Sequence, residues 1–238
     1  MDLKEEDILG EAVSKHWYYQ SKASALLDYV KHLNPQSVLD VGAGSGFFSK
    51  ELLTRTEAKD ALCIDTSYSA ERNDFIANKP IRYRTHSGPV DVDLVLMMDV
   101  LEHVDNDIGL LSEYIDKVSA GTYFLITVPA FSFLWSGHDE FLGHKRRYTL
   151  KEIEKVVENA GLIVECGSYF FGLVFPLAAV LRLLEGSFNS QGHPPRSQLK
   201  KHNPIVNGTL MSICSVDRLF LHINRLAGLT SFCLARKR

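Results

Sequence analysis

The chain has 238 residues, of which 45% are hydrophobic and 23% charged, and its formal net charge is −3 at pH 7. These values are ordinary for a globular chain, and the length allows one large domain with a sizeable core, over residues 1–238. The four cysteines are widely scattered without CxxC spacing, which argues against a zinc knuckle or a disulfide framework.

The two parts of the chain differ in charge. Residues 1–143 hold 12 Lys+Arg against 23 Asp+Glu, whereas residues 144–238 hold 14 against 6. A basic C-terminal part favours an anionic partner, such as a phosphate, a nucleic acid or a lipid head group, or it consists of solvated helix faces. The segment 1–7 is acidic where a signal peptide would be basic and then apolar, so we expect a cytoplasmic protein.

The chain begins with residues at helical spacing. Apolar side chains recur through residues 5–33 until Asn34-Pro35 ends the run, which predicts an N-terminal helical cap over residues 1–33. Between the two helical pieces lies the aromatic stretch 16–22, with Trp, two Tyr and a closing Lys. Aromatic side chains packed so densely usually lie in a core or an interface.

A glycine-rich turn follows the first predicted strand. The strand from Ser37 carries Asp40 near its end, glycines stand at every second position from 42 to 46, and helical spacing starts at Phe47. Glycines there let the backbone approach a ligand closely. Phe47 occupies the place of the third glycine of a dinucleotide fingerprint, and no P-loop lysine follows. Asp40 suits a cationic cofactor without phosphate better than a pyrophosphate.

This Asp-x-Gly-x-Gly-x-Gly pattern resembles motif I of class I S-adenosylmethionine (SAM)-dependent methyltransferases. The segment Asp99-Val-Leu-Glu-His103 resembles the Asp-x-Leu-Glu-His segment of the type 11/12-like branch, which includes small-molecule and quinone-biosynthesis enzymes. In this family an aromatic stretch closes over the SAM methionine, and the basic residue that ends it binds the methionine carboxylate. The resemblance places Lys22 at this basic position, where the family has an arginine.

An acidic residue also ends the second predicted strand. Asp65 follows Gly46 by 19 residues, close to the offset at which an acid meets ribose hydroxyls in doubly wound sheets. From this spacing and the resemblance, the expected cofactor-binding residues are Tyr19, Lys22, Asp40, Gly42, Ala43, Gly44, Gly46, Asp65, Thr66, His86, Met98, Asp99 and His103.

Strands and helices alternate through the middle of the chain. Short strands are predicted at 81–84, 93–98, 122–128 and 162–169, and helices at 107–119 and from the capping box at 149–152 to Gly161. The resemblance implies an antiparallel seventh strand, best matched by residues 229–235. We therefore expect an α/β Rossmann-like, doubly wound, seven-stranded sheet with helices on both faces and its ligands beyond the carboxyl ends of the strands.

The segment 131–148 is predicted to be a long loop that shapes the acceptor site. It resembles a Trp-x-x-His-Asp through Gly-His-x-Arg-Arg-Tyr segment of one branch of the family. The candidate catalytic residues are His138, Asp139 and His144, because imidazole can take a proton near neutral pH. These residues could instead bind a metal, but their spacing is not a recognisable metal-ligand pattern, so no metal is expected. The candidate substrate-binding residues are Trp135, Arg146, Arg147 and Tyr148.

About fifty residues separate the last two predicted strands. We expect a helical insertion over residues 171–226, with a Gly/Pro/Lys-rich link at 192–204 and a helix over 206–226. It is a lid, a dimer surface, or, with Lys200 and Lys201, a peripheral membrane contact. Its apolar run is too short and too interrupted to span a bilayer.

These features predict a SAM-dependent methyltransferase that yields S-adenosylhomocysteine (SAH) and acts on a small-molecule or a lipid- or carrier-linked acceptor, including an anionic one. The signature of enzymes that methylate base amino groups is absent after the fourth strand, so DNA is not an expected substrate. The alternative is a regulatory protein that binds SAM or SAH without catalysis.

Overall fold

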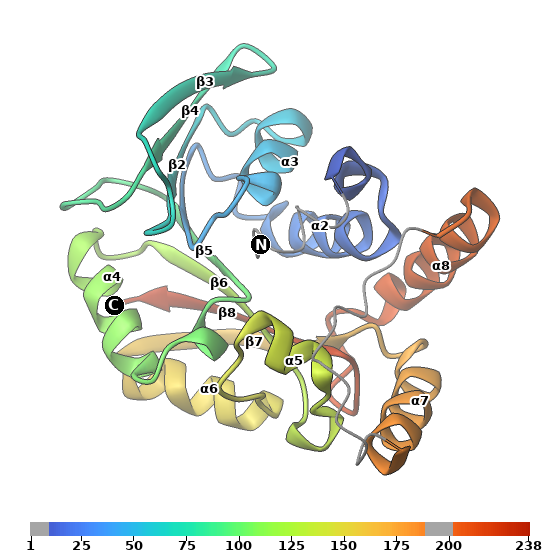
Figure 1. Cartoon of the computed structure of the whole chain (residues 1–238). Helices are drawn as coiled ribbons and strands as arrows, with labels where there is room; N and C mark the ends of the chain where they lie inside the picture. The colour runs from blue at the N-terminus through green and yellow to red at the C-terminus, as the bar shows by residue number, and fades with distance from the viewer. Residues whose placement is uncertain (1–9, 189–201) are drawn as a thin grey trace.

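A computed structural model describes residues 10–188 and 202–238 of the chain. It contains one eight-stranded mixed sheet with the strand order β3-β4-β2-β1-β5-β6-β8-β7 (Figure 1). The strands are β1 (Ser37–Val41), β2 (Asp60–Ile64), β3 (Arg72–Ile76), β4 (Lys79–Arg84), β5 (Leu94–Met98), β6 (Tyr123–Pro129), β7 (Leu162–Phe170) and β8 (Thr230–Lys237).

The centre of the sheet is parallel and both ends are antiparallel. Parallel pairs join β1 to β2, β2 to β4, β1 to β5 and β5 to β6. The last strand, β8, runs antiparallel between β6 and β7, as the family resemblance implies. The doubly wound α/β architecture is therefore confirmed.

The eighth strand is β3, which the sequence analysis missed. It forms an antiparallel hairpin with β4 through Ala77 and Asn78, whose φ angles of 52° and 62° are typical of a tight hairpin turn. Four of the five residues of β3 are exposed, so it lacks the alternation of buried and exposed positions by which a strand is recognised. The sheet has eight strands rather than seven for this reason.

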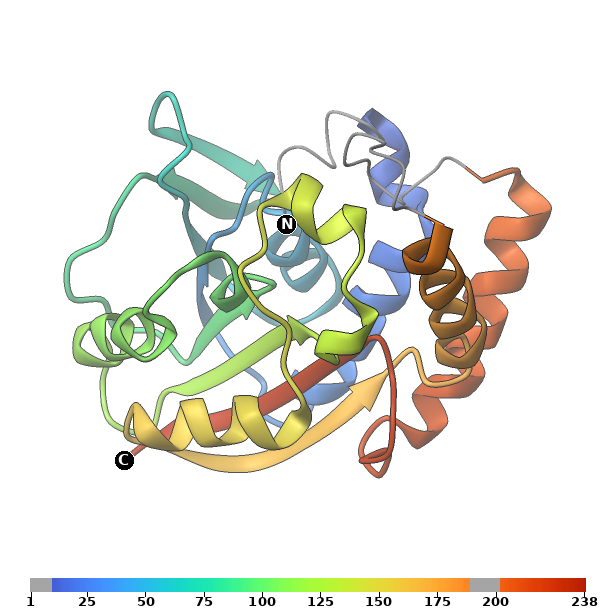
Figure 2. The ribbon, with the colours of Figure 1, turned by 60° about the horizontal axis from the view of Figure 1, so that its bottom comes forward.

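Helices cover both faces of the sheet (Figures 1 and 2). On one face, α2 (Trp17–Val30), α3 (Phe47–Arg55) and the end of α8 (Pro204–Asp217) share a core with side chains such as Leu96 and Leu125. On the other face, α4 (Asp107–Lys117) and α6 (Leu150–Asn159) pack on their strand neighbours, such as Val95 and Phe124. Because successive strand residues point to opposite faces, each buried strand contributes to both cores.

The segment between β6 and α6 is only partly a loop. It contains the short 3-10 helix η3 (Ser132–Leu134) and the helix α5 (Gly137–Leu142), which ends at Gly143 in the left-handed region. A capping box formed by Ser136 and Asp139 starts α5. The candidate catalytic side chains His138 and Asp139 are therefore carried by a helix.

Among the described residues between β7 and β8, two α-helices are formed. They are α7 (Phe175–Phe188) and α8, and the short helix η5 (Arg218–Phe220) follows. The predicted helix over 206–226 ends earlier, at Asp217. The Asp217 carboxylate accepts hydrogen bonds from the Gly172 and Leu173 amides, which ties the end of α8 to the residues after β7. α8 packs against α2, and Arg218 pairs with Asp28 at 2.7 Å.

Some expectations fall on residues outside the described ranges. These are the acidic segment 1–7, the first residues of the helical cap, and most of the link at 192–204 with Lys200 and Lys201. Within residues 10–188 and 202–238, none of the helices has the length and apolar character needed to cross a lipid bilayer.

Candidate functional site

The site is centred on the carboxyl ends of β1, β2 and β5. The chain continues from β1 to β2 and β4 on one side, then returns to form β5 and β6 on the other. The direction of winding therefore changes between β1 and β5, the place where doubly wound sheets bind their ligands. The glycine turn after β1 lies at this point.

The glycine turn has the backbone conformation that its sequence requires. Gly42, Gly44 and Gly46 have φ angles of 65°, 53° and 73°, all in the left-handed region. A Cβ atom on Gly42 would lie 2.7 Å from a methyl group of Val100, and one on Gly46 would lie 3.0 Å from the Tyr83 ring. Ala43 is buried among the core residues. The turn therefore fits closely between the segment after β5 and the end of β4.

Asp65, at the end of β2, contacts the glycine turn directly. Its Oδ2 accepts a hydrogen bond from the Gly44 amide at 2.9 Å, and Tyr68 donates its hydroxyl to the Gly44 carbonyl at 2.5 Å. Thr66 is exposed beside Asp65. The structure thus brings Asp65 and the glycine turn together, as the 19-residue spacing suggests, and adds Tyr68, which the sequence analysis did not select.

Asp40 is buried behind the turn. Its carboxylate is 1% exposed and accepts a hydrogen bond from the Ser49 hydroxyl of α3 at 2.7 Å. Burial, with a smaller contribution from the charge of Asp65, raises the pKa of Asp40 to about 6, although the Ser49 hydrogen bond opposes the shift. Asp40 is therefore held beneath the turn and faces α3.

This raised pKa predicts a pH-dependent stability of the free protein. An unfolded Asp ionises near pH 4, so between pH 4 and 6 the folded state retains a proton that the unfolded state has lost, and stability falls as pH rises. Above pH 6 the cost stays constant at no more than about 3 kcal/mol. We therefore expect Asp40→Asn to be more stable than wild type at pH 8, with a free energy of unfolding about 1–3 kcal/mol larger. At pH 4 we expect the two proteins to have similar free energies of unfolding.

Urea unfolding of both proteins between pH 4 and 8 measures this effect. Asp116→Asn, an exposed substitution at the end of α4, is the matched control and is expected to follow the wild-type curve. A difference between Asp40→Asn and wild type that stays the same at every pH would contradict the prediction.

Lys22 and Asp99 form an ion pair that is buried on the Lys22 side, whereas the Asp99 side chain is 27% exposed. Lys22, on α2, is 0% exposed, and its ammonium bonds to Asp99, the residue that follows β5. Burial lowers the pKa of Lys22, but the charge of Asp99, the charge of Tyr18 and the hydrogen bond to Asp99 together outweigh burial and raise the pKa above its ordinary value. Asp99 has a φ of 58° and accepts a hydrogen bond from the Thr127 hydroxyl at 3.0 Å.

Lys22 and Asp99, both expected at the cofactor, are thus brought together although 77 residues separate them. Tyr19 is also buried on α2, and its ring lies 5.6 Å from that of Phe47 at the start of α3. Met98 is buried at the end of β5. His86 is exposed after β4 and hydrogen-bonds to Thr85.

The short 3-10 helix η2 (Leu101–His103) follows Asp99 and carries a buried acid. Glu102 is 0% exposed, and neither of its carboxylate oxygens has a hydrogen-bond partner among the described residues. Burial and the charge of Asp99 raise the pKa of Glu102 well above its usual range. The next residue, His103, has its ring 4.8 Å from that of His144, in an edge-to-face arrangement.

Asp139 is the centre of a second buried network, on α5. It accepts hydrogen bonds from His144 Nδ1 at 2.8 Å and from Arg147 Nε and Nη2 at 2.7 and 3.1 Å. Burial opposes ionisation of Asp139, but the His144 hydrogen bond and the Arg147 charge outweigh it and hold the pKa below its usual range. Arg147 also donates to the Ala130 carbonyl. These contacts hold Asp139 and Arg147 within the protein.

The other acceptor-side candidates lie in different surroundings. Arg146 donates to the backbone carbonyls of Val104 and Asp105, and the Tyr148 hydroxyl donates to Asp107 at 2.8 Å. Trp135 is 37% exposed. Burial, together with the charge of Arg182, lowers the pKa of His138 to about 4, so its imidazole is neutral at pH 7. The polar groups of Arg146 and Tyr148 thus connect the segment 144–148 to the start of α4.

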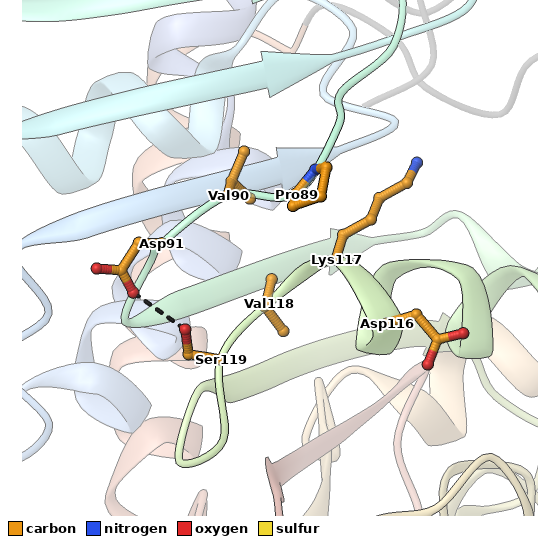
Figure 3. Close-up of a pocket in the computed structure, with 7 residues that line it drawn as sticks. All are labelled: Pro89, Val90, Asp91, Asp116, Lys117, Val118 and Ser119. Atoms are coloured by element: carbon orange, nitrogen blue, oxygen red, sulfur yellow. Dashed lines mark hydrogen bonds between the residues drawn. The ribbon is translucent and has the colours of Figure 1, made fainter.

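A shallow surface depression lies at the opposite edge of the sheet (Figure 3). Its lining comes from residues 89–91 before β5 and residues 116–119 at the end of α4, and the Ser119 hydroxyl donates to Asp91 at 3.2 Å. These segments precede the amino ends of β5 and β6, so the depression is remote from the glycine turn. It has no part in the candidate site.

Residues 15–166 of the chain match a family model described as a methyltransferase domain. No curated protein sequence matches the chain.

Solved structures share the fold at low sequence identity. A SAM-dependent methyltransferase from Archaeoglobus fulgidus is 16% identical with a TM-score of 0.54, over 99% of this chain and 98% of that one. A structure described as that of a sarcosine dimethylglycine methyltransferase from Galdieria sulphuraria is 13% identical with a TM-score of 0.53, over 92% of this chain and 85% of that one. Phosphoethanolamine N-methyltransferase 2 of Haemonchus contortus, solved with SAM, is 16% identical with a TM-score of 0.53, over 92% and 52%.

Proposed function

The chain belongs to the methyltransferase-domain family, whose methyl donor is SAM, and on this premise we propose that it methylates a hydroxyl or carbon of a small-molecule or a lipid- or carrier-linked acceptor. The observation that carries the proposal is the direct contact of Asp65 with the left-handed glycine turn at the switch point of the sheet. SAM supplies an electrophilic methyl group on its sulfonium when it is bound.

The residues around the turn can recognise each part of SAM. Asp65 ends β2 with a carboxylate that can accept the two ribose hydroxyls. The glycines carry no side chains, so the backbone of the turn can lie close to the cofactor. Lys22 and Asp99 supply one cation and one anion for the carboxylate and ammonium of the methionine part. Binding then exchanges part of their mutual ion pair for bonds to the cofactor.

The acceptor side is formed by α5 and the segment that follows it. His138 is neutral at pH 7 and is our candidate to accept the acceptor's proton. Asp139 is the candidate that orients His144, through the 2.8 Å bond to Nδ1. Positioning supplies much of the acceleration when a methyl group moves in line from a sulfonium to a nucleophile.

Calorimetric titration with SAM and SAH tests the cofactor half of this proposal. We expect one site per chain, and a weaker site in Asp65→Ala, because the ribose hydroxyls lose their acceptor. Asp60→Ala, at the other end of β2, is the control. The absence of binding, or equal binding by Asp65→Ala, would contradict the proposed cofactor site.

Turnover separates an enzyme from a protein that only binds SAM. Metabolite profiling of a strain that lacks the protein identifies accumulated unmethylated compounds, and the purified protein should convert them with release of SAH. A protein that binds SAM but releases no SAH with any of these compounds would be the regulatory alternative.

The insertion exposes several large apolar side chains. On α7 these include Leu177 and Val180, at 66% and 54% exposure, and beyond α8 they include Leu219, Ile223 and Leu226, at 78%, 74% and 90%. We propose a cytoplasmic protein that uses this surface for a peripheral membrane contact or a homodimer. Flotation with anionic liposomes and sedimentation in their absence distinguish the two, and a monomer that does not float would exclude both.

A further inference from the structure

We propose that Glu102, His103 and His144 form a binding site for a divalent transition-metal ion beside the glycine turn. Each offers one ligand atom, and these atoms all lie within 4.8 Å of one another. His103 and Glu102 are adjacent on η2, whereas His144 comes from the segment after α5, so the fold alone brings the three together.

The buried carboxylate of Glu102 is the observation that points to a ligand. A polar group that is removed from water without a hydrogen-bond partner costs free energy, so buried carboxylates are normally bonded or coordinated. Glu102 is 0% exposed, and both of its oxygens lack a partner within residues 10–188 and 202–238. A bound cation would supply the missing partner.

His144 is held in the orientation of a metal ligand. Its Nδ1 bonds to Asp139 at 2.8 Å, which leaves Nε2 as the nitrogen that can coordinate. Such a carboxylate partner is usual for metal-binding histidines, since it fixes the ring and makes the coordinating nitrogen more basic. Asp139 is itself held by Arg147, so the supporting group is rigid.

Among the described acids of this group, Glu102 is the one that has no charged partner. The groups that face Glu102 are Asp99 and Lys22, which neutralise each other, and the charge of Asp139 is neutralised by Arg147. These two ion pairs carry no net charge, so they do not repel a cation that is bound by Glu102 and the two imidazoles. Two imidazoles and one carboxylate favour Zn²⁺, Mn²⁺, Fe²⁺ or Co²⁺ over Mg²⁺ and Ca²⁺.

The ligand atoms must move together to coordinate. Donors around a tetrahedral ion with bonds of about 2.1 Å lie roughly 3.4 Å apart, so side-chain rotations of about 1 Å complete the site. The site adjoins the cofactor turn, because Val100, two residues before Glu102, packs against Gly42. If the proposed methyl transfer holds, an ion here would bind an acceptor oxygen and would favour a hydroxyl acceptor.

Titration of the metal-free protein with Co²⁺ and Zn²⁺ tests the site without SAM or acceptor. After treatment with a chelator, we expect one ion per chain, measured by calorimetry and by the visible absorbance of bound Co²⁺. Glu102→Gln keeps the size of the side chain and His144→Gln keeps a polar one; each should weaken binding by tenfold or more. His32→Ala, an exposed histidine of the N-terminal part, is the control and should bind as wild type does.

Two results would overturn the site. One is the absence of stoichiometric binding by the wild type, and the other is equal affinity in wild type, Glu102→Gln and His144→Gln. Circular dichroism of each variant shows that loss of binding is not loss of fold. SAM titration of the same metal-free preparation is independent, so a failure of this site and a failure of the proposed function are distinguishable.

Discussion

Gly44→Arg is expected to weaken SAM binding by at least a hundredfold while leaving the protein folded. Gly44 lies at the middle of the turn with a φ of 53°, and its amide and carbonyl are bonded to Asp65 and Tyr68. An arginine side chain at this position would occupy the space that the glycines leave for the cofactor, and its left-handed backbone would cost only about 1–3 kcal/mol. Calorimetric titration with SAM measures the change.

Gly121→Arg is the matched control for this substitution. Gly121 also has a positive φ, of 88°, but it lies in an exposed turn before β6, where a Cβ atom would meet nothing within 4 Å. Both variants therefore carry similar backbone strain, and only Gly44→Arg changes the turn. SAM binding by Gly44→Arg at wild-type affinity would show that the cofactor does not occupy this turn.

Arg147→Met is expected to lower the free energy of unfolding by about 3–5 kcal/mol, because it leaves the Asp139 carboxylate buried without its main partner. The Arg147 and Asp139 side chains are 3% and 0% exposed and share two hydrogen bonds. A methionine fills much of the volume but supplies no charge. Urea unfolding at pH 7 measures the loss.

The neighbouring residue provides the control. Arg146 pairs with Asp107 at 3.3 Å with 36% of its side chain exposed, so Arg146→Met should cost no more than about 1 kcal/mol. Equal stability of the two variants would contradict the structural role of Arg147. The assignment of Arg147 as a substrate-binding residue stays a prediction. The SAM affinity of Arg147→Met shows whether the substitution acts locally or causes a general loss of fold.

The order of helices and strands was largely predicted correctly, because the signals for each element lie in residues that are close together in the sequence. Strands such as β5 and β6 are continuous apolar runs, and the Thr149-Glu152 capping box starts α6 as expected. β3 was not predicted because its mostly exposed residues show no hydrophobic periodicity. α5 was not predicted because a helix of six residues is too short to show such periodicity.

The local spacing in the sequence was enough to predict that Asp65 meets the glycine turn, where we propose that SAM binds. Asp40, the glycines and Asp65 follow a strand–turn–helix–strand unit whose spacing is local, so their meeting follows from the chain order. Packing of distant segments forms the pairs Lys22–Asp99 and Asp139–Arg147 and brings His144 within 4.8 Å of Glu102 and His103. These contacts depend on how helices and loops pack at the edge of the sheet. Polar side chains that become buried there need partners, and the spacing of residues in the sequence does not show which partner each one meets.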